Sequence, residues 1–173
     1  MKQIVLCHGN NSAHHIIHRD GIVSTVLGSK KEFTLDLKPI DFEKYGVEYR
    51  NLEEHIIAIS LDSCGPVCLK NGYFYSLTDL MPVDDAYEYC IKTKWRSYQH
   101  WELYYEEQLE SLRKLLISLC KKHAIPNKYN ADIWDLSRRA LMGTPGIFCQ
   151  CSFIKNAHDL NPQIELINIL KSL

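Results

Sequence analysis

Short apolar runs that end at turn residues mark the first part of the chain. Residues 4–7, Ile-Val-Leu-Cys, are apolar and partly β-branched, which predicts a short buried strand. Residues 14–18 and 22–26 are rich in β-branched side chains and flank Arg19-Asp20-Gly21, a sequence typical of a tight turn. We therefore expect a hairpin soon after the first strand.

The middle of the chain contains the strongest strand signal and two long polar stretches. Residues 55–61 form a short and almost wholly apolar run, as expected of a central strand. Residues 70–75 place Asn-Gly before an aromatic run, which predicts a second hairpin. Residues 28–53 and 79–100 have no clear period and are expected mainly as loop. A loop as long as 28–53 usually carries function or folds over a site.

The last third of the chain has the helical period. Between residues 106 and 123, apolar side chains recur every three or four positions, and Lys121-Lys122-His123 supply the positive charge favoured in a last turn. We expect a shorter helix within 132–142, a strand at 147–149 and a closing helix within 162–173. The pattern predicts an α/β fold with a single mixed β-sheet flanked by helices, formed by one domain of residues 1–173.

Composition and charge restrict the class of partner. The chain has 20 Lys and Arg against 21 Asp and Glu, a net charge of -1, which argues against a protein that binds duplex nucleic acid. No apolar run has the roughly 18 residues of a membrane span, and the apolar start is too short for a signal peptide. Seven cysteines, an odd number, fit reduced thiols in the cytoplasm.

The order of the segments resembles the zinc-dependent N-acetylmuramoyl-L-alanine amidases, whose fold is shared by phage endolysins and peptidoglycan recognition proteins. The matching pieces lie along nearly the whole chain and are the strand of residues 2–6, the Ser-Ala-His to Arg-Asp-Gly hairpin of 12–21, the strand of 57–62, the helix that follows Trp101-Glu102-Leu103-Tyr104, the strand of 146–148 and the helix of 161–167. This resemblance implies the amidase fold and a phage or bacterial origin.

The positions that bind zinc in the family are changed in this sequence. The histidine that closes the family's first strand aligns with Cys7, beside His8, and the histidine after the last strand aligns with Gln150. The acidic ligand aligns with Asp159, nine residues after Gln150, while the family's lysine falls at Ala157. Because a carboxamide is a poor zinc ligand, the resemblance implies a degenerate member of the family.

Two interpretations of the thiols and imidazoles remain open. Cys7, His8, His158 and Asp159 have the residue types of a zinc site, although their spacing is no established metal signature. Small buried thiols beside a polar loop are the other interpretation, which the sequence favours. We therefore expect no resident cofactor, and zinc is the one that these residues would allow.

Aromatic side chains gather before the long helix, where Trp95, Trp101 and Tyr104 could stack on a sugar, a peptide or a base, or could cover an edge of the core. With His14 and Gln150, they are the candidate ligand-binding residues. The sequence thus predicts a non-catalytic protein that binds a small muropeptide-like or nucleotide-like ligand in a remodelled groove. An active amidase with an atypical zinc site and an interaction protein that uses residues 28–53 are the alternatives. The oligomeric state is not predicted.

Overall fold

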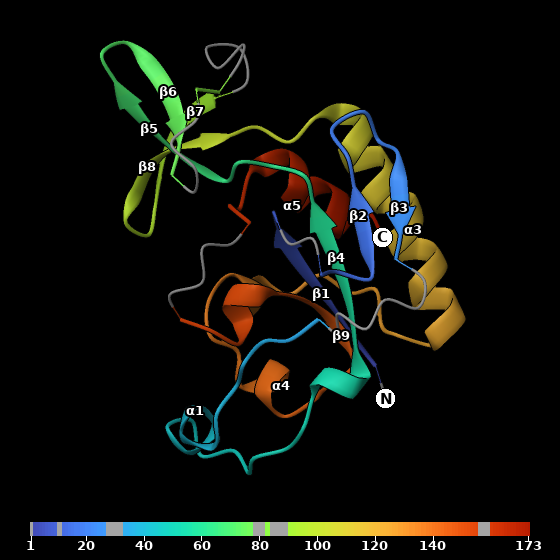
Figure 1. The fold of residues 1–173 in the computed structure, drawn as a ribbon. Coiled ribbons are helices and arrows are strands. Elements are labelled where there is room, and N and C mark those ends of the chain that lie inside the picture. Colours follow the sequence, from blue (N-terminus) through green and yellow to red (C-terminus); the bar gives the residue numbers. More distant parts are fainter. Residues whose placement is uncertain (1, 10–11, 27–32, 78–81, 84–89, 156–159) are drawn as a thin grey trace.

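A computed structural model describes residues 2–9, 12–26, 33–77, 82–83, 90–155 and 160–173 (Figure 1). The strands are β1 (Gln3–His8), β2 (His15–Ile17), β3 (Val23–Thr25), β4 (Ile56–Leu61), β5 (Pro66–Lys70), β6 (Tyr73–Ser76), β7 (Cys90–Trp95), β8 (Tyr98–Glu102) and β9 (Gly146–Cys149). The α-helices are α1 (Pro39–Glu43), α3 (Glu106–His123), α4 (Arg138–Leu141) and α5 (Ile164–Lys171), and the 3-10 turns are η1 (Glu53–His55), η2 (Ala131–Trp134) and η3 (Gln150–Ser152).

The first sheet is mixed and has the strand order β3-β2-β4-β1-β9. The strands β1, β2, β4 and β9 run parallel, and only β3 is antiparallel, to its neighbour β2. Every residue of β4 is buried, as the apolar run of residues 55–61 predicts for a central strand. The strand predictions for residues 4–7, 14–18, 22–26, 55–61 and 147–149 are confirmed.

A second, antiparallel sheet with the order β6-β5-β8-β7 lies beyond the carboxyl ends of the parallel strands (Figure 1). The expectation of a single sheet is therefore wrong, whereas the α/β class and the mixed sheet are confirmed. The Asn71-Gly72 turn joins β5 to β6 with both residues at positive φ, 53° and 81°, as a two-residue hairpin requires.

The assignment of residues 79–100 to loop is also wrong where the structure describes them. Residues 90–95 and 98–102 form β7 and β8, and they pair through a short turn in which Arg96 adopts a φ of 55°. Residues 79–81 and 84–89 lie outside the described part of the chain. The turn contains no glycine or asparagine, the residues that most often adopt a positive φ. The sequence therefore gives no turn signal at Arg96.

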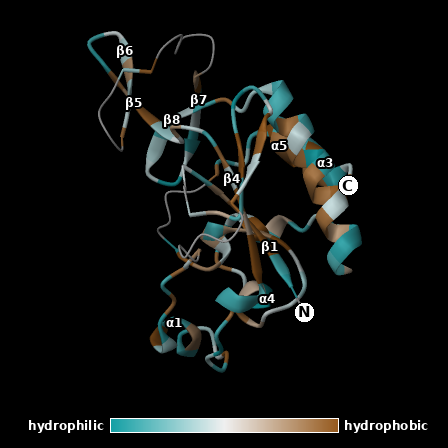
Figure 2. Cartoon of the chain, turned by 45° about the vertical axis from the view of Figure 1, so that its right-hand side comes forward, coloured by the Kyte–Doolittle hydropathy of each residue, from teal (hydrophilic) through white to brown (hydrophobic). Residues whose placement is uncertain are grey.

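The long helix α3 has the bounds that the period predicts and buries Leu109, Leu112, Leu116 and Leu119. It packs beside α5, and the two helices lie together on one side of the first sheet in both views (Figures 1 and 2). The α4 helix lies toward the other end of the strands, and α1 lies beyond it, at the lower left of the view (Figure 1). In the described residues, no helix has the length and apolar character of a membrane span.

The single helix expected within 132–142 is interrupted. The 3-10 turn η2 comes first, Asp135 is extended, and α4 begins after Ser137, whose hydroxyl accepts a hydrogen bond from the Ala140 amide at 3.3 Å. The Asp132 carboxylate accepts a hydrogen bond from the Ser137 hydroxyl at 2.8 Å, so both side chains serve as local caps in place of helix continuation.

Candidate functional site

The carboxyl ends of four parallel strands meet at one edge of the first sheet, directly below the second sheet. In open α/β sheets, ligands bind at this edge. The predicted positions Cys7 and His8 end β1, and Gln150 follows the last residue of the neighbouring β9. The structure therefore brings these three residues to one edge, as the resemblance implies.

The side chains of Cys7 and His8 are directed into the protein. The Cys7 thiol is fully buried and donates a hydrogen bond to the carbonyl oxygen of Ile59 at 3.6 Å. The His8 imidazole packs on Gly65 so closely that a methyl group at that glycine would lie 2.8 Å from both ring nitrogens. Successive residues of a strand face opposite sides, so Cys7 and His8 point apart.

Cys7, His8 and Gln150, the predicted positions that the structure describes, do not form a zinc site. Gln150 offers an amide oxygen, which is a weak zinc ligand, and the Cys7 thiol already donates a hydrogen bond. Among the residues that the structure describes, no three His, Cys, Asp or Glu side chains are grouped as metal ligands. The predicted ligands His158 and Asp159 lie outside the described residues.

Cys149 and Cys151 would lie on one face of β9 if the strand continued through Gln150, but β9 ends at Cys149. Cys149 is its last residue and η3 follows, so Cys151 does not continue the strand. The Cys151 thiol donates a hydrogen bond to the carbonyl oxygen of Ile133 at 3.4 Å. Both cysteines are fully buried, which agrees with the interpretation of small core thiols.

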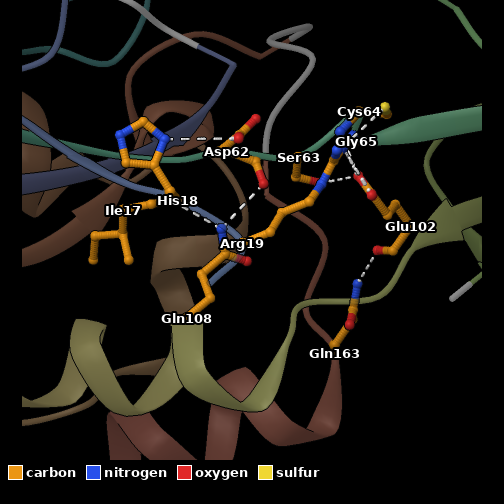
Figure 3. Close-up of polar contacts among 10 residues, drawn as sticks. All are labelled: Ile17, His18, Arg19, Asp62, Ser63, Cys64, Gly65, Glu102, Gln108 and Gln163. Carbon is orange, nitrogen blue, oxygen red and sulfur yellow. Dashed lines mark hydrogen bonds and ion pairs between the residues drawn. The ribbon is translucent and has the colours of Figure 1, made fainter. Parts of the chain in front are cut away.

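A buried carboxylate joins the two sheets at this edge (Figure 3). Glu102, 2% exposed, ends β8 and accepts hydrogen bonds from the Ser63 hydroxyl at 3.0 Å and from the Cys64 amide. The Arg19 guanidinium lies 2.9 Å from the same carboxylate and 3.4 Å from the Cys64 sulfur. We call Arg19, Ser63, Cys64 and Glu102 the junction cluster.

Two glutamines hold the backbone around the junction cluster. Gln108 of α3 donates from its amide to the carbonyl oxygens of Ile17 at 2.9 Å and Asp62 at 3.0 Å. Gln163, which precedes α5, donates to the carbonyl oxygen of Glu102 at 2.7 Å. Both helices therefore fix the strand ends that carry the junction cluster (Figure 3).

Burial and the charges of the junction cluster together raise the pKa values of its arginine and of the neighbouring thiol of Cys90. Burial lowers the pKa of Arg19, but the charges of Glu102, Cys64 and Asp62 outweigh it and raise that pKa overall, so the guanidinium stays charged. Burial, assisted by Glu102 and Cys64, raises the pKa of Cys90 to about 11. The Cys90 thiol is therefore protonated at neutral pH and is a poor nucleophile.

Two of the three predicted ligand-stacking aromatics are buried. Trp101 is 1% exposed, with its ring centroid 5.2 Å from that of Trp95 and 5.5 Å from that of Tyr98. Tyr104 is 7% exposed and accepts a hydrogen bond from the Asn161 amide at 2.9 Å. Their burial favours the core-edge interpretation, while Trp95 is half-buried.

A groove of about 550 Å³ opens between the loop of residues 35–45 and the segment that follows η3. Its lining residues are Leu35, Asp36, Leu37, Asp41, Lys44, Tyr45, Leu136, Phe153, Ile154 and Lys155. The Arg96 guanidinium donates to the carbonyl oxygen of Lys155 at 2.7 Å and lies 4.7 Å from the centre of the Trp95 ring. This contact brings Trp95 close to the chain at one end of the groove.

His14 is placed apart from Gln150 and Trp95. It precedes β2, accepts a hydrogen bond from the Ala58 amide at 3.0 Å, and lines a different cavity at the other end of the parallel strands. The predicted ligand-binding residues are thus not one site. The sequence predicts a functional role for residues 28–53 as a whole, and not for the loop residues that line the groove. No pattern in the sequence indicates that Arg19 and Glu102 form a pair.

Comparisons of the chain with protein-family models, with curated proteins and with solved structures find no significant match.

Proposed function

We propose that this chain is a non-catalytic protein that binds a small ligand in the groove between residues 35–45 and 153–155. The ligand is muropeptide-like or nucleotide-like, and the scaffold is a degenerate amidase fold. The groove itself is the observation that carries the proposal. Its volume of about 550 Å³ lies within the roughly 300–1,000 Å³ of small-molecule pockets.

The lining of the groove supports an amphipathic ligand. Leu35 and Phe153, each 2% exposed, provide an apolar base, and Tyr45 offers an exposed aromatic ring. Lys44 and Lys155 suit the carboxylate of a muropeptide or the phosphate of a nucleotide, and Asp36 and Asp41 suit donor groups elsewhere on the same ligand. Polar groups around an apolar base fix the orientation of a ligand in a pocket.

The backbone of the groove is held in an unusual conformation. Asp36 has a φ of 49°, a region that costs most side chains energy. The Glu53 carboxylate fixes this bend, because one of its oxygens accepts hydrogen bonds from the Leu35 amide at 2.9 Å and from the Asp36 amide at 3.3 Å. Such strained positions are concentrated at ligand-binding sites, and this bend supports a preformed groove.

Titration calorimetry with a muramoyl tripeptide and with a nucleoside monophosphate tests the proposal. We expect one of them to bind the unaltered protein, and Tyr45→Ala and Lys155→Ala each to weaken that binding at least tenfold. Tyr73→Ala is the matched control, because Tyr73 is exposed on the hairpin of the second sheet. Absence of binding by both probes, or equal losses in Tyr45→Ala and Tyr73→Ala, would contradict the proposal.

The non-catalytic part of the proposal has its own test. We expect no hydrolysis of peptidoglycan with added zinc, because Gln150 is a weak zinc ligand and the Cys7 thiol faces a backbone carbonyl. Hydrolysis that a chelator abolishes, and that Asp159→Ala also abolishes, would favour the active-amidase alternative.

A further inference from the structure

A second cavity of about 350 Å³ lies where the parallel strands begin, at the end of the sheet opposite the junction cluster. It is lined by Lys2, His14, Phe33, Asn51, Glu53, Glu54, Ile56 and Ile57, none of which lines the groove. Phe33, Ile56 and Ile57 are buried and form an apolar base. The remaining residues surround this base with groups of both charges.

One side of the cavity carries hydrogen-bond donors. The Ala58 amide donates to Nδ1 of His14 at 3.0 Å, so the neutral imidazole must carry its proton on Nε2. Burial, together with the charge of Lys2, lowers the pKa of His14 and keeps the ring neutral at pH 7. The cavity therefore has an imidazole N–H from His14 and an ammonium group from Lys2.

The acceptors come from the turn η1. One carboxylate oxygen of Glu53 accepts hydrogen bonds from the Thr34 hydroxyl at 2.6 Å and from the Leu35 amide at 2.9 Å. The Glu54 carboxylate accepts a bond from the Asn51 amide at 3.3 Å. Within the described chain, neither Glu53 nor Glu54 forms an ion pair with Lys2. The ammonium group and the carboxylates of the cavity therefore do not neutralise each other by direct contact.

The strand order explains why the charges are kept apart. The β4 strand lies between β2 and β1, so His14 and Lys2 approach its first residues from its two sides. The turn η1 leads into β4 and places Glu53 and Glu54 at its amino end. Ile56 and Ile57 form the apolar base in the middle.

We propose that this cavity binds a free α-amino acid with an aliphatic side chain. The α-carboxylate contacts Lys2 and Nε2–H of His14, the α-ammonium contacts Glu54, and the side chain lies on Phe33, Ile56 and Ile57. A simple anion would meet two carboxylates and a simple cation would meet Lys2, whereas a zwitterion satisfies both. This inference is independent of the function proposed for the groove.

Calorimetric titration with L-leucine tests the inference. 4-Methylpentanoate lacks the ammonium group and 3-methylbutylamine lacks the carboxylate, so the pair separates the two halves of the recognition. We expect L-leucine to bind at least tenfold more tightly than either analogue. Lys2→Met and Glu54→Gln should each weaken L-leucine binding at least tenfold, and both replace exposed side chains.

Lys70→Met is the matched control for charge, because Lys70 is exposed at the end of β5, in the other sheet. It should leave the affinity for L-leucine unchanged, as should Tyr45→Ala in the groove. The inference is overturned if L-leucine shows no binding at millimolar concentration, or if 4-methylpentanoate or 3-methylbutylamine binds as tightly. Since these outcomes do not involve the groove ligands, they are distinct from a failure of the proposed function.

Discussion

The guanidinium of Arg19 lies 2.9 Å from the carboxylate of Glu102, although 83 residues separate the two along the chain. Arg19 belongs to the turn of the first hairpin, and Glu102 ends a strand of the second sheet. The contact therefore fixes one sheet to the other. Glu102 is shielded from water, whereas the Arg19 side chain is 40% exposed.

Replacing Arg19 by methionine should destabilise the protein by about 1–3 kcal/mol. This is less than the ~3–5 kcal/mol of a fully buried pair, because Arg19 is 40% exposed and Glu102 keeps its bonds from Ser63 and Cys64. Urea unfolding measures the change. Arg113→Met is the control, since Arg113 pairs with Glu110 on the surface at 3.9 Å and should cost no more than about 0.5 kcal/mol. Equal costs for the two variants would show that the pair does not join the sheets.

Truncating the helix α3 at Leu116 should open a cavity in the main core. Leu116 is fully buried, so Leu116→Ala should reduce the free energy of unfolding by about 2–5 kcal/mol. The neighbouring Ile117 is 41% exposed, and Ile117→Ala should change it by about 0.5 kcal/mol or less. A smaller loss for Leu116→Ala than for Ile117→Ala would mean that the buried face of α3 is assigned wrongly.

The elements that the sequence predicts well are those whose pattern is local. The 3.6-residue period fixes α3, and the apolar run fixes β4, because each element buries one continuous set of side chains. The strand β7 also had a signal, since Lys92 and Lys94 are exposed and alternate with half-buried neighbours. That alternation alone does not predict a hairpin, because no glycine or asparagine marks the turn at Arg96.

The candidate sites are less predictable because they depend on contacts distant in sequence. The strand predictions for residues 4–7 and 147–149 put Cys7 and Gln150 at strand ends, but no pattern in one sequence pairs Arg19 with Glu102. Trp101 shows the same limit, since an aromatic side chain has the same sequence signal whether it faces a ligand or fills a core. Its 1% exposure is decided by the sheet around it.

The histidines near the start of the parallel strands should make stability depend on pH. Burial lowers the pKa of His14 and of His15, and for His14 the charge of Lys2 adds to the effect. The unfolded chain, with histidine near 6.5, therefore takes up protons before the folded chain does. The stability that these groups contribute is complete above pH 6.5 and is lost as the pH falls through their lower folded values.

Urea unfolding at pH 7.5, 6.5 and 5.5 measures this dependence. We expect His14→Gln and Lys2→Met to lose less stability than the unaltered protein between pH 7.5 and 5.5. Lys70→Met, in the second sheet, should behave as the unaltered protein does. An unchanged pH dependence in His14→Gln would show that this histidine titrates alike in the folded and unfolded chain.

A pair of glycines separates the cost of backbone strain from the cost of displacing His8. Gly65 and Gly46 have nearly the same φ, 66° and 62°, so alanine at either position should cost about 1–2 kcal/mol of backbone strain. At Gly46 the added methyl group meets no atom within 4 Å, whereas at Gly65 it meets the His8 ring. Gly65→Ala should therefore cost about 1–3 kcal/mol more than Gly46→Ala.

The double variant His8→Ala with Gly65→Ala identifies the cause of that excess. Removal of the imidazole leaves room for the methyl group, so the cost of Gly65→Ala in the His8→Ala background should fall to that of Gly46→Ala. Urea unfolding of the unaltered protein, the two single variants and the double variant gives the coupling free energy between His8 and Gly65. If the excess persists without the imidazole, the strain at Gly65 comes from the backbone between β4 and β5 and not from the His8 ring.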